Sequence, residues 1–533
     1  MQPPPNCSPV HPVLANSTNV DKGRSAFFSA PPRPLKTKRP SVADLKDDSR
    51  RKRVKLSFPE PDVSEEEQTD ESDVEMEDLA DFNPPVVTTQ SVFQMTQRRA
   101  TLRPGLSSRP FHLPTRPILQ SFVSSHKSDI FKCQSLDDGA FLTPPYACAY
   151  THAAKMGGMP LLAVATEQGT VHMLNTSKRD EWDYELPRTV LQVHDNGIFD
   201  VQWSPTDAFF ATTSGDQSVC VVDVTAKKVL HVLRGHTSTV KCVVWDPANT
   251  SLLSTGGRDG GICIWDLRVA DQSIGLQPIV TIVGAHGEDA PAKGRGRRPK
   301  PNTAGRSVTS LLYPEGDPYG LISSGTFHGI LRYWDLRQPT GNRKGKAKQP
   351  KAITQPAHRS EFDPTMLNGS RPRGITSLVA GSGPTAGLIF GLGIDSRIHT
   401  YASSSLSPIA NGGTGTFSHP QMQVNNFYVR LALSPDGCHL ASGSAGPRGA
   451  AFLYDVSDAG RTFSSADTRG VELRSQHGEV GALDWADGTL ATCADDGTVR
   501  IWRQDLKKKR ECEADEETAA WHYAWATDGA GLS

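Results

Sequence analysis

From about residue 111 onward, the chain alternates short apolar runs with clusters of Gly, Asp and Pro. Such runs, rich in β-branched and aromatic residues and bounded by turn residues, predict short β-strands. The pattern recurs along the chain. The run STVKCVVWDP is followed by LLSTGGRDGGICIWDLR, and GEVGALDWAD is followed by LATCADDGTVRIWR. Self-similarity of this kind predicts a repeat architecture in which each unit is one small sheet.

The repeats have the spacing of propeller blades. Seven copies align, beginning with LLAVATEQGTVHMLN. Asp223 and Asp266 lie 43 residues apart, which is the length of one four-stranded blade. Asp266 and Asp335 lie 69 residues apart because the basic insertion GEDAPAKGRGRRPKPNTAGR separates them. We therefore predict an all-β, seven-bladed WD-repeat β-propeller over residues 111–505.

The two ends of the predicted ring should pair, because open sheet edges are hazardous. The segment after Trp502 is charged, RQDLKKKRECEADEE, and contains no good fourth strand. We expect the missing strand to come from the N-terminal side, within residues 111–124. Residues 506–533 are then expected to form a charged C-terminal tail.

Two blades carry matching polar residues. His236 and His477 open them, a Thr lies four residues before a turn Asp, and a Trp lies six residues after it. The two sets are His236, Thr255, Asp259 and Trp265, and His477, Thr492, Asp496 and Trp502. Indole, hydroxyl, imidazole and carboxylate can form a buried hydrogen-bond chain that stabilises a blade when every member is satisfied.

The same residue types would suit a hydrolase triad, but their distribution favours a structural role. The set recurs in separate blades and is incomplete in others, where Val222 replaces the Trp and His328 replaces the turn Asp. No Gly-rich phosphate loop, carboxylate pair or metal-ligand cluster stands out elsewhere. We therefore predict a non-enzymatic protein with no catalytic residue, metal or cofactor.

Residues 1–110 differ from the rest of the chain. They are rich in Pro, Ser and charge, with little apolar periodicity, and so predict a long disordered N-terminal tail. Two basic clusters have the spacing of a bipartite nuclear-localisation signal; they contain Lys36, Lys38 and Arg39, and Arg50, Arg51, Lys52 and Arg53. We expect a nuclear protein, although basic runs are also common in disordered tails. The acidic block at residues 60–81 is either a spacer or a site for basic partners.

Composition excludes several classes of protein. The net charge is -1, and no stretch of about 18 apolar residues predicts a membrane span. The first residues lack the apolar core of a signal peptide. The nine cysteines are scattered singly, with no C-x-x-C pair, which indicates a reducing compartment without disulfides or a zinc site.

Two neighbouring repeats end in Trp-Asp-x-Arg, and this motif adds information about function. Its residues are Trp265, Asp266 and Arg268, and Trp334, Asp335 and Arg337. The motif resembles that of the substrate receptors of cullin-4 ubiquitin ligases. The resemblance implies that the arginines contact the ligase adaptor, the large subunit of the UV-damaged-DNA-binding protein, on the narrow face. The alternative is a plain blade end, where a basic residue after Trp-Asp is unremarkable.

The order of segments is similar to one such family, the denticleless receptors. TGGRDGGICIWDLR, GILRYWDLR, FYVRLALSPDG and ATCADDGTVRIWR follow one another, and the resemblance covers about residues 144–503. It implies recognition of proteins bound to the sliding clamp at replication forks, including a replication-licensing factor, for ubiquitination. Substrates would bind the wider face or the central channel.

Some features depart from the family or stay open. Animal members have a long C-terminal tail with a clamp-binding motif. Here Gln421, Val424, Phe427 and Tyr428 fit that motif, but the last two are expected to begin a strand. The basic loop at residues 293–306 either makes a weak contact with DNA phosphates or is a solubilising insertion. The alternative to the ligase function is a chromatin- or histone-binding scaffold.

Overall fold

The computed structural model describes residues 116–180, 184–269, 276–287, 306–337, 351–366, 371–409, 416–460 and 469–528. The chain divides into two units, Met1–Leu106 and Ser107–Ser533, and every described residue belongs to the second. The predicted N-terminal tail lies outside the described residues, with its acidic block and its localisation residues Lys36, Lys38, Arg39 and Arg50–Arg53. The same holds for the basic loop up to residue 305.

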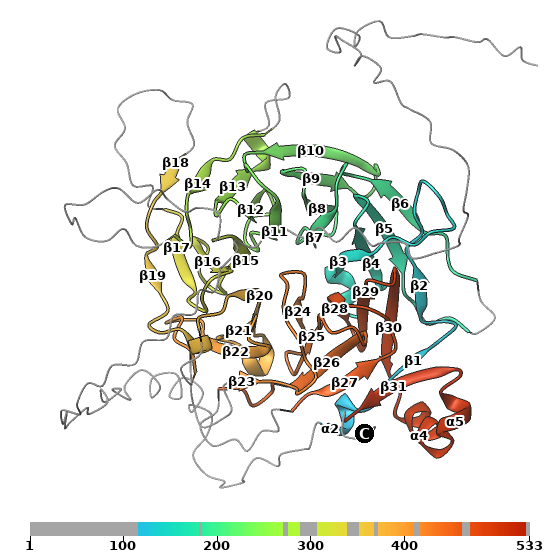
Figure 1. Cartoon of the computed structure of the whole chain (residues 1–533). Helices are drawn as coiled ribbons and strands as arrows, with labels where there is room; N and C mark the ends of the chain where they lie inside the picture. Colours follow the sequence, from blue (N-terminus) through green and yellow to red (C-terminus); the bar gives the residue numbers. More distant parts are fainter. Residues whose placement is uncertain are drawn as a thin grey trace, which may run out of the picture. The chain divides into compact units, whose positions relative to one another are not determined.

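The second unit is an all-β propeller whose sheets stand around a centre (Figure 1). The first two sheets contain β3 (Pro145–Tyr150), β4 (Leu161–Thr166), β5 (Thr170–Asn175) and β6 (Thr189–Gln192), then β7 (Ile198–Trp203), β8 (Phe209–Ser214), β9 (Ser218–Asp223) and β10 (Lys228–Arg234). The third contains β11 (Val240–Trp245), β12 (Leu252–Gly257), β13 (Ile262–Asp266), β14 (Val280–Ile282) and β18 (Lys351–Ile353).

Three further sheets complete the unit. The fourth contains β15 (Val308–Leu312), β16 (Gly320–Gly325), β17 (Arg332–Asp335) and β19 (His358–Arg359), and the fifth β20 (Ile375–Ala380), β21 (Leu388–Gly393), β22 (Arg397–Ala402) and β23 (Thr416–Phe417). The sixth has ten strands: β24 (Leu431–Leu433), β25 (His439–Ser442), β26 (Ala450–Asp455), β27 (Val471–Arg474), β31 (Tyr523–Thr527), β1 (Phe122–Ser125), β30 (Thr498–Gln504), β29 (Thr489–Ala494), β28 (Val480–Ala486) and β2 (Ile130–Lys132).

The innermost strands contact one another in a closed circuit. It runs β3, β7, β11, β15, β20, β24, β28 and back to β3. The core lies between neighbouring sheets, where three tryptophans repeat one contact. The indole Nε1 of Trp203, Trp245 and Trp485 each donates to a backbone carbonyl of the preceding innermost strand. Each indole therefore packs between two neighbouring innermost strands and ties them together.

The predicted closing strand is confirmed. β1 pairs antiparallel with β30, with Phe122 opposite Gln504. β31 in turn pairs with β1 and with β27, and so joins two sets of strands into the ten-stranded sheet. Hydrogen bonding thus gives six sheets among the described strands, and the count of seven blades stays a prediction.

The expected charged C-terminal tail is wrong for residues 506–527. They form α4 (Leu506–Ala514), α5 (Glu516–Ala519) and β31. Asp505 caps α4 by accepting a hydrogen bond from Lys508 N, and Cys512 is buried. The charge of this segment did not prevent it from ordering, because a lysine ammonium can be held over the face of an aromatic ring. The Lys508 ammonium lies 4.3 Å from the centre of the Tyr523 ring of β31.

The remaining helices are short. They are α2 (Arg116–Leu119), α3 (His152–Lys155), η1 (Leu267–Val269), η3 (Pro364–Met366) and η4 (Gly383–Thr385). Across the described ranges, no helix has the length and apolar character needed to span a membrane.

Candidate functional site

The hydrogen-bond chain predicted for the third sheet is present. Trp265 Nε1 donates to Thr255 Oγ1 at 2.9 Å, and Thr255 Oγ1 lies 2.8 Å from His236 Nε2. His236 Nδ1 lies 3.1 Å from Asp259 Oδ2, which also accepts from Thr237 N. Burial alone would raise the pKa of Asp259, but the hydrogen bond and charge of His236 together with the backbone N–H groups of Thr237 and Gly261 outweigh burial and lower that pKa to about 2. Trp265 and Thr255 are fully buried, whereas the Asp259 side chain is partly exposed.

The second predicted set needs a correction. Trp502 Nε1 donates to Thr492 Oγ1 at 3.1 Å as expected, but Gln476, not His477, occupies the imidazole position. Thr492 Oγ1 donates to Gln476 Oε1 at 2.7 Å, while His477 contributes only its backbone N–H to Asp496. A carboxamide has both an acceptor and a donor, so it can replace the ring at this position.

Two related networks were missed by sequence reasoning. His194 Nε2 lies 2.9 Å from Thr212 Oγ1, and its Nδ1 lies 2.9 Å from Asp216 Oδ2. In the fourth sheet, Ser323 Oγ accepts from Trp334 Nε1 and lies 2.9 Å from His286 Nε2. The available signal for His194 was its place four residues before β7, which matches that of His236 before β11, whereas the basic insertion separates His286 from β15. The same hydrogen bond between a His and a hydroxyl recurs in separate sheets, which supports a structural role for these residues.

The two Trp-Asp-x-Arg motifs have the same geometry. Trp265 and Trp334 are buried, and their indoles anchor β13 and β17 from within the sheets. Arg268 Nε and Nη2 donate to the two carboxylate oxygens of Asp266 at 2.9 and 2.7 Å. Arg337 donates in the same way to Asp335, at 2.9 and 2.9 Å. The tryptophans and aspartates therefore position the arginines and offer little surface of their own.

The arginine side chains themselves face solvent. That of Arg268 is 63% exposed and that of Arg337 is 59% exposed. Hydrogen bonding from Arg268 is the main cause that lowers the pKa of Asp266, and Arg337 does the same for Asp335. Each guanidinium binds its own aspartate through Nε and Nη2. Its Nη1 has no hydrogen-bond partner among the described residues. The free part of the fork can bind an outside acceptor in a fixed direction.

The surroundings of the two arginines differ. The Arg337 guanidinium carbon lies 5.2 Å from the centre of the Tyr319 ring, and Tyr319 is half exposed. Arg268 is followed by Val269, which is 61% exposed. Arg and Tyr are both enriched among the residues that dominate protein interfaces, so the environment of Arg337 is the more typical of an interface.

The residues that fit a clamp-binding motif do not form a free segment. Val424 is buried, and Phe427 and Tyr428 are half-buried in the turn before β24. The expectation that these two aromatics begin the strand is wrong, because β24 starts at Leu431. Their rings stack on each other, with centres 4.3 Å apart, and pack into the centre of the propeller.

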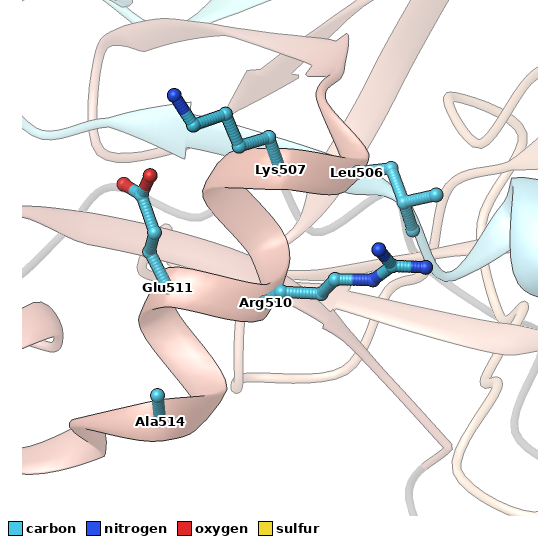
Figure 2. A pocket seen from close by; sticks show the side chains of 5 residues that line it. All are labelled: Leu506, Lys507, Arg510, Glu511 and Ala514. Carbon is cyan, nitrogen blue, oxygen red and sulfur yellow. The ribbon is translucent and has the colours of Figure 1, made fainter.

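One shallow hollow lies along α4 (Figure 2). It is lined by Leu506, Lys507, Arg510, Glu511 and Ala514. All five belong to one short helix, and their charges are mixed. The described residues also contain no group of three or more His, Cys, Asp or Glu side chains that could hold a metal ion. Eight cysteines lie within the described ranges, and none of them is in a disulfide.

Comparison with known proteins agrees with the repeats. The family model for the WD domain, G-beta repeat, matches residues 185–223, 227–266 and 470–503. The chain is 29% identical over 441 residues to "Denticleless protein homolog A" of Xenopus laevis, covering 80% of this chain and 56% of that protein. It is 30% identical over 447 residues to the Gallus gallus homolog, covering 81% and 57%.

The human homolog is similar to the same extent. It is 29% identical over 443 residues, covering 79% of this chain and 54% of that protein. A chain in a crystal structure of a mitotic checkpoint complex matches with a TM-score of 0.47 and 18% identity, covering 76% of this chain and 97% of that one. The chain thus spans little more than half the length of the curated relatives it matches. From its WD repeats and from similarity over about four-fifths of its length, the chain is a denticleless-like member of the WD-repeat proteins.

Proposed function

We propose that this chain is the substrate-recognition subunit of a cullin-4 RING ubiquitin ligase, with no catalytic activity of its own. The observation that carries the proposal is the matched pair Arg268 and Arg337. The ubiquitin-transfer steps would belong to the RING subunit and its partner enzyme, and this chain would bring a substrate to them.

The geometry of the pair supports binding to a ligase adaptor. The two arginines follow the third strands of neighbouring sheets, β13 and β17, whose innermost strands β11 and β15 are in contact. Each is held by the aspartate two residues before it, and each is more than half exposed. A side chain that is already held in place loses less conformational freedom on binding, so more of its interaction energy contributes to affinity.

We also propose that the propeller has seven blades. Support comes from the circuit of innermost strands, which has seven members. In this interpretation the ten-stranded sheet is two blades, β24 to β27 and β28 to β30 with β1, bridged by β31. Bridging of this kind leaves no open edge at the point where the chain ends meet.

The substrates we propose are replication and cell-cycle proteins, such as a licensing factor bound to the sliding clamp, marked for proteasomal degradation. Nuclear location through the two basic clusters is part of the same proposal. Support here comes from similarity to the denticleless homologs and from the basic clusters. A reporter fused to residues 1–100 should accumulate in the nucleus and lose this location when both clusters are changed to alanine.

Affinity purification followed by mass spectrometry tests the proposal. The tagged chain should recover the adaptor and cullin-4, and ubiquitination of a licensing factor should require clamp loaded on DNA. Recovery of histones without adaptor or cullin would favour the chromatin-binding alternative. Equal ubiquitination without the clamp would remove the denticleless-type substrate while leaving the receptor role.

A further inference from the structure

The same break in strand pairing recurs at the second residue of six of the innermost strands. In each of them the pairing register shifts around one residue, so that residue is bulged out of the ladder. The six are Tyr146, Phe199, Lys241, Thr309, Thr376 and Gly481. A bulge redirects the side chain it carries, and bulges are frequent next to functional sites.

Several of these redirected side chains meet at the centre of the ring. The Tyr146 and Phe199 rings are stacked with centres 5.9 Å apart, and Tyr146 also stacks on Tyr428 at 5.2 Å. Arg430 Nη2 donates to the backbone carbonyls of Phe199 and Lys241 at 3.1 and 3.0 Å. Arg430 directly precedes β24, whose neighbours in the circuit are β20 and β28, whereas its acceptors belong to β7 and β11. These bonds therefore span the central channel.

Lys241 stands out in this cluster because its charge is unbalanced. The residue is only 5% exposed, and its ammonium lies 3.7 Å from the centre of the Phe427 ring. No carboxylate of the described ranges pairs with it. Burial is the main cause that lowers the pKa of Lys241 to about 8, and the nearby Arg258 and Arg430 contribute to this lowering rather than supporting its charge. A buried ammonium without a counter-ion is costly, and contact with a ring face offsets only part of this cost.

The neighbouring carboxylates are already engaged. Asp200 accepts from Val243 N and lies 3.9 Å from Arg430, and Glu479 accepts from Asn426 Nδ2. Lys241 keeps 5% of its surface exposed, so it is nearly but not completely enclosed. The centre of the ring thus holds a lysine ammonium against an aromatic ring, and no carboxylate of the described residues forms an ion pair with it.

We propose that Lys241, with Arg430 and the rings of Phe427 and Tyr428, forms a subsite for an anionic side chain of a bound peptide. The anion is a carboxylate or a phosphate group, both of which accept strong hydrogen bonds from an ammonium. The rings would pack against the apolar part of the same peptide. The inference deepens the proposed receptor function, on which it rests, by naming a chemical feature of the recognised segment.

The test uses the full chain and three small probes, measured by NMR titration. The probes are the N-methylamides of N-acetyl-glutamate, N-acetyl-glutamine and N-acetyl-phosphoserine. We expect an anionic probe to bind at least about tenfold more tightly than the glutamine probe, and Lys241→Met to remove this difference. Lys228→Met, at an exposed lysine of β10, is the matched control and should leave binding unchanged. Lys241→Arg keeps the charge and should keep part of the preference.

The outcomes separate the sources of the anion. Preference for the glutamate probe identifies a carboxylate, and binding of the phosphoserine probe alone identifies a phosphorylated residue. Equal binding of all three probes, or unchanged binding in Lys241→Met, overturns the proposal. If Lys241→Met fails to fold, Lys241→Gln makes the same comparison. Adaptor binding, measured in parallel, should be unchanged in these variants, so failure of this subsite is distinct from failure of the receptor proposal.

Discussion

Arg268 and Arg503 both follow the tryptophan near the end of a third strand, but their surroundings are opposite. Arg268 lies three residues after Trp265, and its side chain is 63% exposed. Arg503 lies directly after Trp502, and its side chain is 15% exposed. Arg503 Nε donates to Asp129 at 3.0 Å, and its Nη2 donates to the carbonyl of Thr176 at 2.6 Å.

The difference follows from the residue after the tryptophan. Asp266 takes that place in the third sheet and holds Arg268 at the surface through a bidentate pair. Arg503 takes it in the last sheet and ties β30 to Asp129, which lies between β1 and β2. A basic residue after Trp is thus not enough to indicate an interface. The aspartate that turns the arginine outward is the informative part of the motif.

The largest expected effect is on the inward arginine. Arg503→Met leaves the carboxylate of Asp129 buried without its partner and should lower the free energy of unfolding by about 3 kcal/mol. Urea titration measures this. The matched variant Arg268→Met should leave the urea midpoint nearly unchanged. Equal midpoints for the two variants would contradict the contrast drawn between these arginines.

The next effect concerns the sheet that carries Arg268. Thr255→Val removes the hydroxyl shared by Trp265 Nε1 and His236 Nε2, and both would lose a buried partner. Stability should fall by about 2 kcal/mol. The control is Thr237→Val, at an exposed threonine of the preceding loop. A fall no larger than that of the control would show that the network does not hold β13 in place.

A smaller effect distinguishes the third sheet from the last one by pH. Burial lowers the pKa of His236, but its interactions with Asp259 and Cys263 together outweigh burial and raise that pKa to about 10. The resulting stabilisation is complete below about pH 6.5 and is lost as the pH rises toward 10. His236→Gln, which copies Gln476 of the last sheet, should reduce the decline in melting temperature between pH 7 and 10. An unchanged decline would contradict this role.

The smallest effect on stability is expected for the aspartates of the motifs. Asp266→Asn with Asp335→Asn keeps the side-chain shape but weakens the pairs that direct Arg268 and Arg337 outward. Adaptor affinity should fall roughly fivefold, because the arginines would then lose more freedom on binding, while the melting temperature changes little. Unchanged affinity would mean that the aspartates do not position the arginines.

Much of the fold was predictable because each repeat is recognisable from residues that are close together in the sequence. Alternating strands, turn glycines and the Trp-Asp ends gave the propeller, and the absence of a strand right after Trp502 led correctly to β1. Gln476 was missed because a carboxamide can replace imidazole in a hydrogen-bond chain, which a search for His cannot detect. α4 and β31 were missed because the charge of α4 hid their pairing, in which the ammonium groups of Lys508 and Lys509 in α4 lie over the rings of Tyr523 and Trp525 in β31.

The candidate site was predictable only in part. The motif gave the positions of Arg268 and Arg337, but not that one edge of each guanidinium is taken by its own aspartate. The central cluster depends on bulges in separate strands and on Arg430 crossing between them. No local pattern encodes such a meeting of distant residues.

The most direct test of the central claim is the affinity of the purified chain for the purified ligase adaptor, measured by biolayer interferometry. Truncating each exposed arginine should weaken binding about thirtyfold, so Arg268→Ala with Arg337→Ala should reduce affinity by about three orders of magnitude if the two act independently. Arg397→Ala, at an exposed arginine of β22, is the control. We predict that the double variant loses adaptor binding while its melting temperature matches that of the control. Adaptor binding equal to that of the control would contradict the account.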